Sequence, residues 1–155
     1  MRAAVITVST SRSRGEAEDT GGPALVALVE RIGCEVIATE TVADERELIA
    51  RRLRHFADEQ DCALVATTGG TGLSPDDVTP EATLDVIDRE APGIAEAMRL
   101  ASREHVPGHW MLSRGVAGAR GRTLIVNFPG NPNAIEQAGA AIADGLPHAL
   151  ALLAR

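Results

Sequence analysis

The chain has 155 residues, of which 45% are hydrophobic and 24% charged, and its formal net charge is −7. This length predicts a single domain, residues 1–155, that is large enough to bury a hydrophobic core. All 15 basic residues are arginine, and no stretch gathers enough of them to follow a phosphate backbone, so we expect no nucleic-acid partner. The absence of lysine excludes a Walker A loop, a Schiff base and a covalent lysyl-AMP.

The sequence shows no sign of a reactive cysteine pair, a zinc site or a membrane-spanning segment. Cys34 and Cys62 lie in apolar stretches without a CxxC partner, which predicts two buried thiols. The four histidines lack the spacing of a zinc site, and we expect the single tryptophan, Trp110, to pack at a helix end. The first ten residues do not resemble a signal peptide and no apolar run reaches 18 residues, so we expect a cytoplasmic protein with no membrane contact.

Strand and helix patterns alternate in the first half of the chain. Short apolar runs predict strands at residues 2–9, 34–42 and 62–68. After a polar loop at residues 10–22, apolar residues at helical spacing predict helices at residues 23–33 and 45–60. The alternation predicts right-handed crossovers and an α/β domain of three layers, αβα, with a mostly parallel, Rossmann-like central sheet.

The second half predicts further helices and a short strand pair. We expect two helices between residues 80 and 104, divided at Pro92 and Gly93. The pair comprises residues 115–119 and 122–128, with a hairpin turn near 118–121. A helix from Asn133 to about Asp144 follows, and then an apolar helix at residues 146–154. The leucines of this last helix either close the monomer or line a subunit contact.

A glycine-rich loop carries the strongest chemical signal. The run TTGGTG, residues 67–72, follows the third predicted strand, and ligands bind at the carboxyl ends of strands in open α/β sheets. Three glycines in four positions permit positive φ, so that successive N–H groups can form an anion-binding nest. Asp77 adds a carboxylate that could hold Mg²⁺ or position a nucleophile. The alternative is a tight turn in which Asp77 caps the helix near Pro80.

Three further positions are candidates for the same crevice. Asp44 ends the second strand, where it either caps the next helix or reaches toward the ligand. Ser113 and Arg114 offer a hydroxyl and a guanidinium fork suited to phosphate or carboxylate, or else form a surface salt bridge. The turn Pro129-Gly130-Asn131-Pro132 either clamps a flat ligand with its backbone groups or is an ordinary strand-to-helix turn.

Together, the motifs TTGGTG, DDVTPEAT, LSR and FPGNP resemble those of the MoaB/Mog family, which includes the molybdopterin adenylyltransferases of molybdenum cofactor biosynthesis. The resemblance runs from ITVSTSR, through EDTGGPAL and VADERELI, to PGNPNAI. It implies Mg²⁺-dependent transfer of AMP from ATP to the terminal phosphate of molybdopterin, with release of pyrophosphate. It also implies a homotrimer and a downstream molybdenum-insertion enzyme. The alternatives are an inactive molybdopterin carrier and a nucleotide-pyrophosphate hydrolase.

The resemblance also implies roles for particular residues. Asp44 and Asp77 match acidic positions that serve catalysis and metal binding. Nucleotide or pterin binding is implied for Thr68, Gly69, Gly70, Thr71, Gly72, Ser113, Arg114, Pro129, Gly130 and Pro132. One departure is present: where the family commonly has Ser-Asp-Arg after the first strand, this chain reads Thr10-Ser11-Arg12, although a nearby carboxylate, Asp19, remains in EDTGG.

Overall fold

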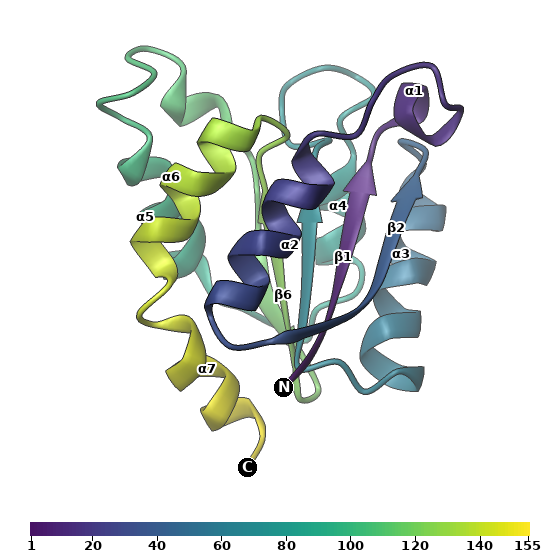
Figure 1. Ribbon diagram of the computed structural model, residues 1–155, viewed down its shortest axis with the longest axis vertical. Helices are drawn as coiled ribbons and strands as arrows, with labels where there is room; N and C mark the ends of the chain where they lie inside the picture. Colours follow the sequence, from purple (N-terminus) through teal and green to yellow (C-terminus); the bar gives the residue numbers. More distant parts are fainter.

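A six-stranded sheet forms the centre of the molecule in the computed structural model, which describes residues 1–155 (Figure 1). The strands are β1 (Arg2–Val8), β2 (Glu35–Val42), β3 (Leu64–Thr68), β4 (Arg89–Glu90), β5 (Ala117–Arg120) and β6 (Thr123–Phe128). Their order in the sheet is β2-β1-β3-β6-β5-β4. The first four strands of this order are parallel, β5 pairs antiparallel with β6, and β4 pairs antiparallel with β5.

Helices cover both faces of this sheet. They are α1 (Thr10–Ser13), α2 (Gly21–Arg31), α3 (Arg46–Arg54), α4 (Thr79–Leu84), α5 (Pro92–Ala101), α6 (Pro132–Ile142) and α7 (Leu146–Leu153), with a π-helical turn at His55–Glu59 and a 3-10 turn at Trp110–Leu112. One layer contains α2, α5, α6 and α7, and the opposite layer contains α3 and α4 (Figure 1). The predicted three-layer αβα fold is confirmed. None of its helices has the length and hydrophobicity that a membrane-spanning helix requires.

Alternate residues of the central strands divide the interior into two cores. Ala3 and Val5 of β1 pack in the core under α2 and α6, whereas Ala4 and Ile6 pack in the core under α3 and α4. Successive side chains of a strand point to opposite faces, so a strand covered on both faces must be apolar throughout. The two cysteines are buried in different cores, as predicted, and burial raises the pKa of both thiols.

The loop predicted in the first half of the chain was wrong. The span 10–22, predicted as a loop, contains α1 and the start of α2. The Ser9 hydroxyl accepts a hydrogen bond from the backbone N–H of Arg12 and so caps α1. The Asp19 carboxylate accepts one from the N–H of Gly22 at 2.9 Å, which ties down the start of α2. Short polar segments with such local bonds do not show the apolar periodicity on which helix prediction depends.

The second half also differs from the prediction in two places. The two helices between residues 80 and 104 are present, but α4 ends at Leu84 and the edge strand β4 lies between them. Pro92 is the first residue of α5. Proline is favourable there because the N–H group that it lacks would have no partner within the helix. The strand pair β5–β6 is part of the central sheet, because β6 also pairs with β3. Leu146 and Leu150 fill the monomer core and are each 2% exposed.

Candidate phosphate-binding site

One open pocket collects residues from the carboxyl ends of all four parallel strands. The chain after β1, β2, β3 and β6 converges at this edge of the sheet, as expected for an open α/β fold. The lining residues are Val8, Ser9, Arg12, Asp44, Gly69, Gly70, Thr71, Gly72, Asp77 and Gly130. We call this the glycine-loop pocket, after the glycine loop at residues 69–72. The structure therefore brings both predicted aspartates, the glycine loop and Gly130 together.

All four carbonyls of the glycine loop are bound within the protein. The first two accept hydrogen bonds from Thr79, at 3.0 Å from its hydroxyl and 3.1 Å from its backbone N–H. The last two accept hydrogen bonds from Arg114, at 2.8 Å from its backbone N–H and 2.8 Å from its Nε. These two residues therefore fix the orientation of every peptide group in the loop.

Three backbone N–H groups of the loop, by contrast, have no hydrogen-bond partner in the protein. The N–H groups of Gly70, Thr71 and Gly72 donate to no acceptor in the protein. Gly69 and Gly70 adopt φ of +93° and +66°, and an added Cβ would lie 2.4 Å from the Val8 carbonyl oxygen and 2.3 Å from the Thr79 hydroxyl oxygen, respectively. Successive free N–H groups in such a loop bind anions, phosphate above all. The structure therefore has the row of free N–H groups that the predicted anion nest requires.

Asp44 lies on one side of this loop. Its Oδ2 accepts hydrogen bonds from the backbone N–H and the hydroxyl of Thr10, at 2.8 and 2.9 Å, while its Oδ1 accepts none. That free Oδ1 lies 3.4 Å from the position of a Cβ on Gly70. The helix α3 begins at Arg46, with Glu45 as its N-cap residue. The alternative that Asp44 caps this helix is therefore wrong, and its carboxylate lies in the crevice instead.

Asp77 lies on the other side of the loop. Its Oδ2 accepts a hydrogen bond of 3.0 Å from the N–H of Ser74 and lies 2.7 Å from the position of a Cβ on Gly72. Its Oδ1 has no hydrogen-bond partner, and the N-cap residue of α4 is Val78. The alternative that Asp77 caps this helix is also wrong. Glycine at position 72 leaves the space in which the carboxylate meets the loop.

Asp44 and Asp77 are the residues of this pocket that could hold a magnesium ion beside a phosphate. Asp44 and Asp77 each keep one oxygen free, and both flank the free N–H groups of the loop. No group of three or more His, Cys, Asp or Glu side chains lies close enough together to hold a metal ion. Mg²⁺ is usually held by one or two carboxylates together with waters and substrate phosphates, rather than by an all-protein cage.

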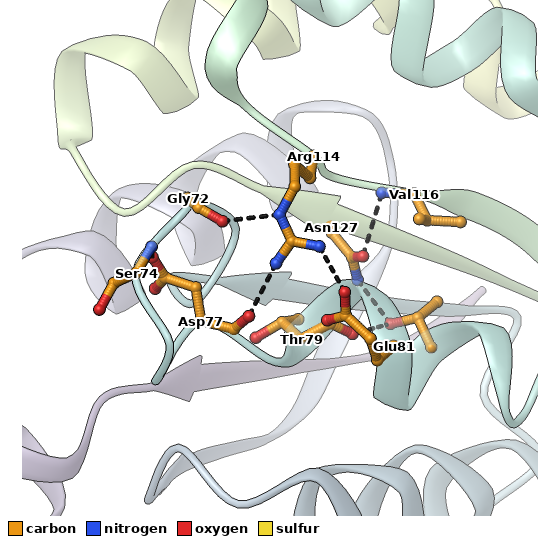
Figure 2. A network of polar contacts seen from close by, with 9 residues as sticks. Gly72, Ser74, Asp77, Thr79, Glu81, Arg114, Val116 and Asn127 are labelled. Carbon is orange, nitrogen blue, oxygen red and sulfur yellow. Dashed lines mark hydrogen bonds and ion pairs between the residues drawn. The ribbon is translucent and has the colours of Figure 1, made fainter.

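Arg114 ties two walls of the pocket together (Figure 2). Besides its bond to Gly72, its guanidinium donates to the backbone carbonyl of Asp77 at 2.7 Å and forms an ion pair with Glu81. Hydrogen bonding from Arg114 is the main cause that holds the pKa of Glu81 below its ordinary value. All three guanidinium nitrogens are therefore engaged inside the protein. The ion pair with Glu81 bears out the alternative that Arg114 forms a salt bridge, whereas its bonds to the carbonyls of Gly72 and Asp77 were not predicted.

A network of buried polar side chains connects β6 to Thr79, the residue that binds the first two carbonyls of the glycine loop (Figure 2). The Asn127 amide donates to the hydroxyls of Thr67 and Thr83, at 3.0 and 2.9 Å, and its carbonyl accepts from the N–H of Val116. Thr83 in turn donates to the carbonyl of Thr79, which holds the loop. The roles of Asn127 and Thr83 were missed because they depend on contacts between distant parts of the chain. The signal available was Asn127 itself, an amide in an otherwise apolar strand.

The other predicted site residues surround the neighbouring turn at residues 129–132. Ser113 and Pro129 line a second, mainly apolar pocket between α5, α6 and the 3-10 turn that begins at Trp110. The Thr68 hydroxyl donates to the Pro129 carbonyl at 2.7 Å, and Pro132 is the first residue of α6. Because Gly130 lines the glycine-loop pocket, this turn separates the two pockets.

Asp19 does not belong to the glycine-loop pocket. Its Oδ2 accepts a hydrogen bond of 2.7 Å from the hydroxyl of Thr7, so that the carboxylate joins β1 to the start of α2. It lines a separate groove between α2 and the strands β1 and β2. The acid that remains in the EDTGG motif is thus a structural link, and the first loop contributes Ser9 and Arg12 to the glycine-loop pocket.

The fold and the pocket define an α/β protein with an open pocket, lined in part by free backbone N–H groups, at the carboxyl edge of its sheet. Comparison with known families identifies the kind: residues 4–148 match the family described as a probable molybdopterin binding domain, and the chain belongs to this family.

Individual relatives agree with this assignment. The chain is 39% identical over 151 residues to the molybdopterin adenylyltransferase of Helicobacter pylori strain J99, a match that covers 96% of this chain and 85% of that protein. It is 43% identical over 139 residues to the molybdopterin adenylyltransferase of Haemophilus influenzae, with 88% and 70% covered. The crystal structure of the molybdopterin biosynthesis enzyme MoaB from Thermus thermophilus superposes with a TM-score of 0.92 at 47% identity, with 98% and 95% covered.

Proposed function

We propose that this protein is a molybdopterin adenylyltransferase that transfers AMP from ATP to the terminal phosphate of molybdopterin and releases pyrophosphate. One observation carries the proposal: three free N–H groups of the glycine loop lie between two carboxylates that each keep a free oxygen. Two of the relatives described above, 39% and 43% identical, are molybdopterin adenylyltransferases, which supports the same reaction.

The reaction is a direct displacement at phosphorus. An oxygen of the molybdopterin phosphate attacks the α-phosphorus of ATP, the new P–O bond forms, and the bond to the leaving pyrophosphate breaks. No covalent enzyme intermediate is needed, which agrees with a chain that contains no lysine. Catalysis then consists of positioning and charge neutralisation. The N–H groups of Gly70, Thr71 and Gly72 perform both tasks, because they hold phosphate oxygens through fixed dipoles.

The two aspartates are positioned for the metal that accompanies ATP. Asp44 and Asp77 would hold Mg²⁺ through their free oxygens, and the ion would supply positive charge beside the phosphates. Thr10 fixes the bound oxygen of the first carboxylate, and Ser74 fixes that of the second. Both free oxygens are thereby held in place without a metal.

The second pocket suits the flat ring of a substrate. Its lining includes Trp110, Met98 and Pro129, and it adjoins the phosphate site across the turn at residues 129–132. We assign a ring, pterin or adenine, to this apolar pocket. From the family alone, we further propose one domain over residues 1–155, a homotrimer that works in the cytoplasm, and a molybdenum-insertion enzyme that receives the product.

Pyrophosphate release tests the proposal. The purified protein is incubated with Mg-ATP, with and without molybdopterin, and pyrophosphate is measured. We expect release only when molybdopterin is present. Release without molybdopterin would instead identify a nucleotide-pyrophosphate hydrolase. Molybdopterin binding without any release would identify a carrier, and either result would overturn the proposed transfer.

A further inference from the structure

The glycine-loop pocket contains a single cationic side chain. Arg12 is the only basic residue that lines it, against the two carboxylates of Asp44 and Asp77. Under the proposed function, the pocket receives the triphosphate of ATP and a second phosphate, so the bound groups carry more negative charge than one Mg²⁺ neutralises. An excess of negative charge that is not neutralised weakens binding of such a ligand. A cation supplied by the protein is therefore required.

The geometry of Arg12 leaves its charge available to a ligand. Its Nε donates to the backbone carbonyl of Glu18 at 2.9 Å, which orients the guanidinium. Its two terminal nitrogens have no acceptor in the protein, and Arg12 belongs to none of the ion pairs of the structure. The neighbouring Arg114 differs, because all three of its nitrogens are engaged. A guanidinium with two unengaged terminal nitrogens matches the bidentate geometry of phosphate.

The segment that carries Arg12 is fixed to the site. Thr10, two residues earlier, donates its N–H and its hydroxyl to Asp44, and Ser9 caps the short helix α1. The guanidinium is therefore positioned by the same contacts that position one of the two carboxylates. A pre-positioned charge of this kind stabilises a transition state without reorganisation at the moment of reaction.

We propose that Arg12 binds the phosphates of ATP that leave as pyrophosphate, and that it is a catalytic residue of the transfer. Negative charge grows on the leaving pyrophosphate as the bond to the α-phosphorus breaks, and the Arg12 guanidinium neutralises it. This inference rests on the proposed function for the identity of the leaving group. The binding of pyrophosphate itself tests it independently of turnover.

The experiment compares Arg12→Ala and Arg12→Lys with the control Arg14→Ala. Arg14 is the C-cap residue of the same short helix, is exposed and does not line the pocket, so its substitution removes the same charge nearby. Binding of inorganic pyrophosphate with Mg²⁺ is measured by calorimetry, and kcat is measured by pyrophosphate release. We expect Arg12→Ala to weaken pyrophosphate binding at least tenfold and to lower kcat about a hundredfold. Arg12→Lys keeps a charge without the fork and should recover part of both losses, while Arg14→Ala should match the wild type.

Three outcomes decide the matter. If Arg12→Ala binds pyrophosphate as tightly and turns over as fast as Arg14→Ala, the inference is overturned. If Arg12→Ala weakens only the binding of molybdopterin, the guanidinium serves the acceptor phosphate and the inference is again overturned. If the wild type transfers no AMP but Arg12→Ala still loses pyrophosphate binding, the proposed reaction fails while the pyrophosphate site at Arg12 stands.

Discussion

The guanidinium of Arg114 donates a hydrogen bond of 2.7 Å to the backbone carbonyl of Asp77. The same side chain binds the carbonyl of Gly72 at 2.8 Å, so one residue from a distant part of the chain sets the spacing between the glycine loop and the carboxylate beside it. Glu81 completes the contact by pairing with the remaining nitrogen. The shape of the phosphate site therefore depends on a residue that does not line it.

Arg114→Lys should lower kcat at least tenfold, because an ammonium group cannot reach three acceptors at once. Lost hydrogen bonds should also cost about 1–3 kcal/mol of unfolding free energy. The control is Arg120→Lys, since Arg120 makes a similar set of bonds, to Asp58 and to the Val86 carbonyl, away from the pocket. Steady-state kinetics and urea unfolding should show that this control loses stability and keeps kcat. Equal kcat values in the two variants would contradict the positioning role.

Asp77→Ala should abolish adenylyl transfer and leave the fold intact, because the residue lies in a loop and its side chain makes one hydrogen bond. Asp76→Ala removes the same charge from the adjacent exposed position, outside the pocket, and should retain full activity. Circular dichroism confirms folding, and pyrophosphate release reports activity. Unchanged turnover in Asp77→Ala would remove this carboxylate from the mechanism.

Two substitutions of Asp44 should separate its structural role from its chemical role. Asp44→Asn keeps an oxygen that can accept the hydrogen bonds of Thr10 and removes the charge, so stability should be close to that of the wild type while activity is lost. Asp44→Ala removes both, and should also lose about 1–3 kcal/mol of unfolding free energy. Thermal melts and turnover are measured for both variants. An active Asp44→Asn enzyme would show that the carboxylate serves only to hold Thr10.

Gly70→Ala should weaken Mg-ATP binding by more than the strain of a positive φ at an alanine explains. The positive φ of +66° costs an alanine about 1–2 kcal/mol, and its Cβ would also meet the Thr79 hydroxyl oxygen at 2.3 Å. Gly121→Ala is the control, with φ of +52° and no atom within 4 Å of the added Cβ. We expect similar strain in both variants but loss of Mg-ATP binding only in Gly70→Ala. Equal ATP affinities of Gly70→Ala and Gly121→Ala would show that the loop tolerates the added Cβ, and would contradict this prediction.

The pair of Glu81 and Arg114 should make stability depend on pH in the acid range. Hydrogen bonding by Arg114 lowers the pKa of Glu81 in the folded state, whereas an unfolded glutamate titrates near pH ~4.3. The pair therefore stabilises the fold above that pH, and its contribution is lost as the pH falls through the lower folded-state pKa. Glu81→Gln lacks the titrating group. The difference in urea midpoint between wild type and Glu81→Gln should be constant above pH ~5 and shrink below pH ~4. A constant difference at all pH values would contradict this role.

The sequence predicted the layers of the fold and the place of the site for physical reasons that are local. Buried strands such as β3 are continuous apolar runs, and three glycines within four positions are readable without any tertiary information. Asp44 and Asp77 were candidates from their positions after predicted strands, and the family motifs added their catalytic and metal-binding roles. The position of a loop after a parallel strand then located the pocket, because such loops meet at one edge of the sheet.

The remaining features depend on tertiary contacts that no local pattern contains. The two-residue strand β4 forms only because β5 lies beside it, and Asp44 turns toward Thr10, which is 34 positions away. The sequence left open whether Arg114 binds a ligand or forms a salt bridge, because its partners, Asp77 and Glu81, cannot be identified from the sequence. Arg12 was noted in the sequence only because its neighbour, Ser11, stands where the family commonly has an aspartate.

The fate of the α-phosphate of ATP decides whether the pocket performs the proposed chemistry. ATP labelled at the α-phosphorus is incubated with Mg²⁺, molybdopterin and either wild-type protein or Asp77→Ala, and the label on molybdopterin is measured. We predict label on molybdopterin with the wild type and none with Asp77→Ala. Label recovered only as ATP or free AMP with the wild-type protein would contradict adenylyl transfer at the glycine loop.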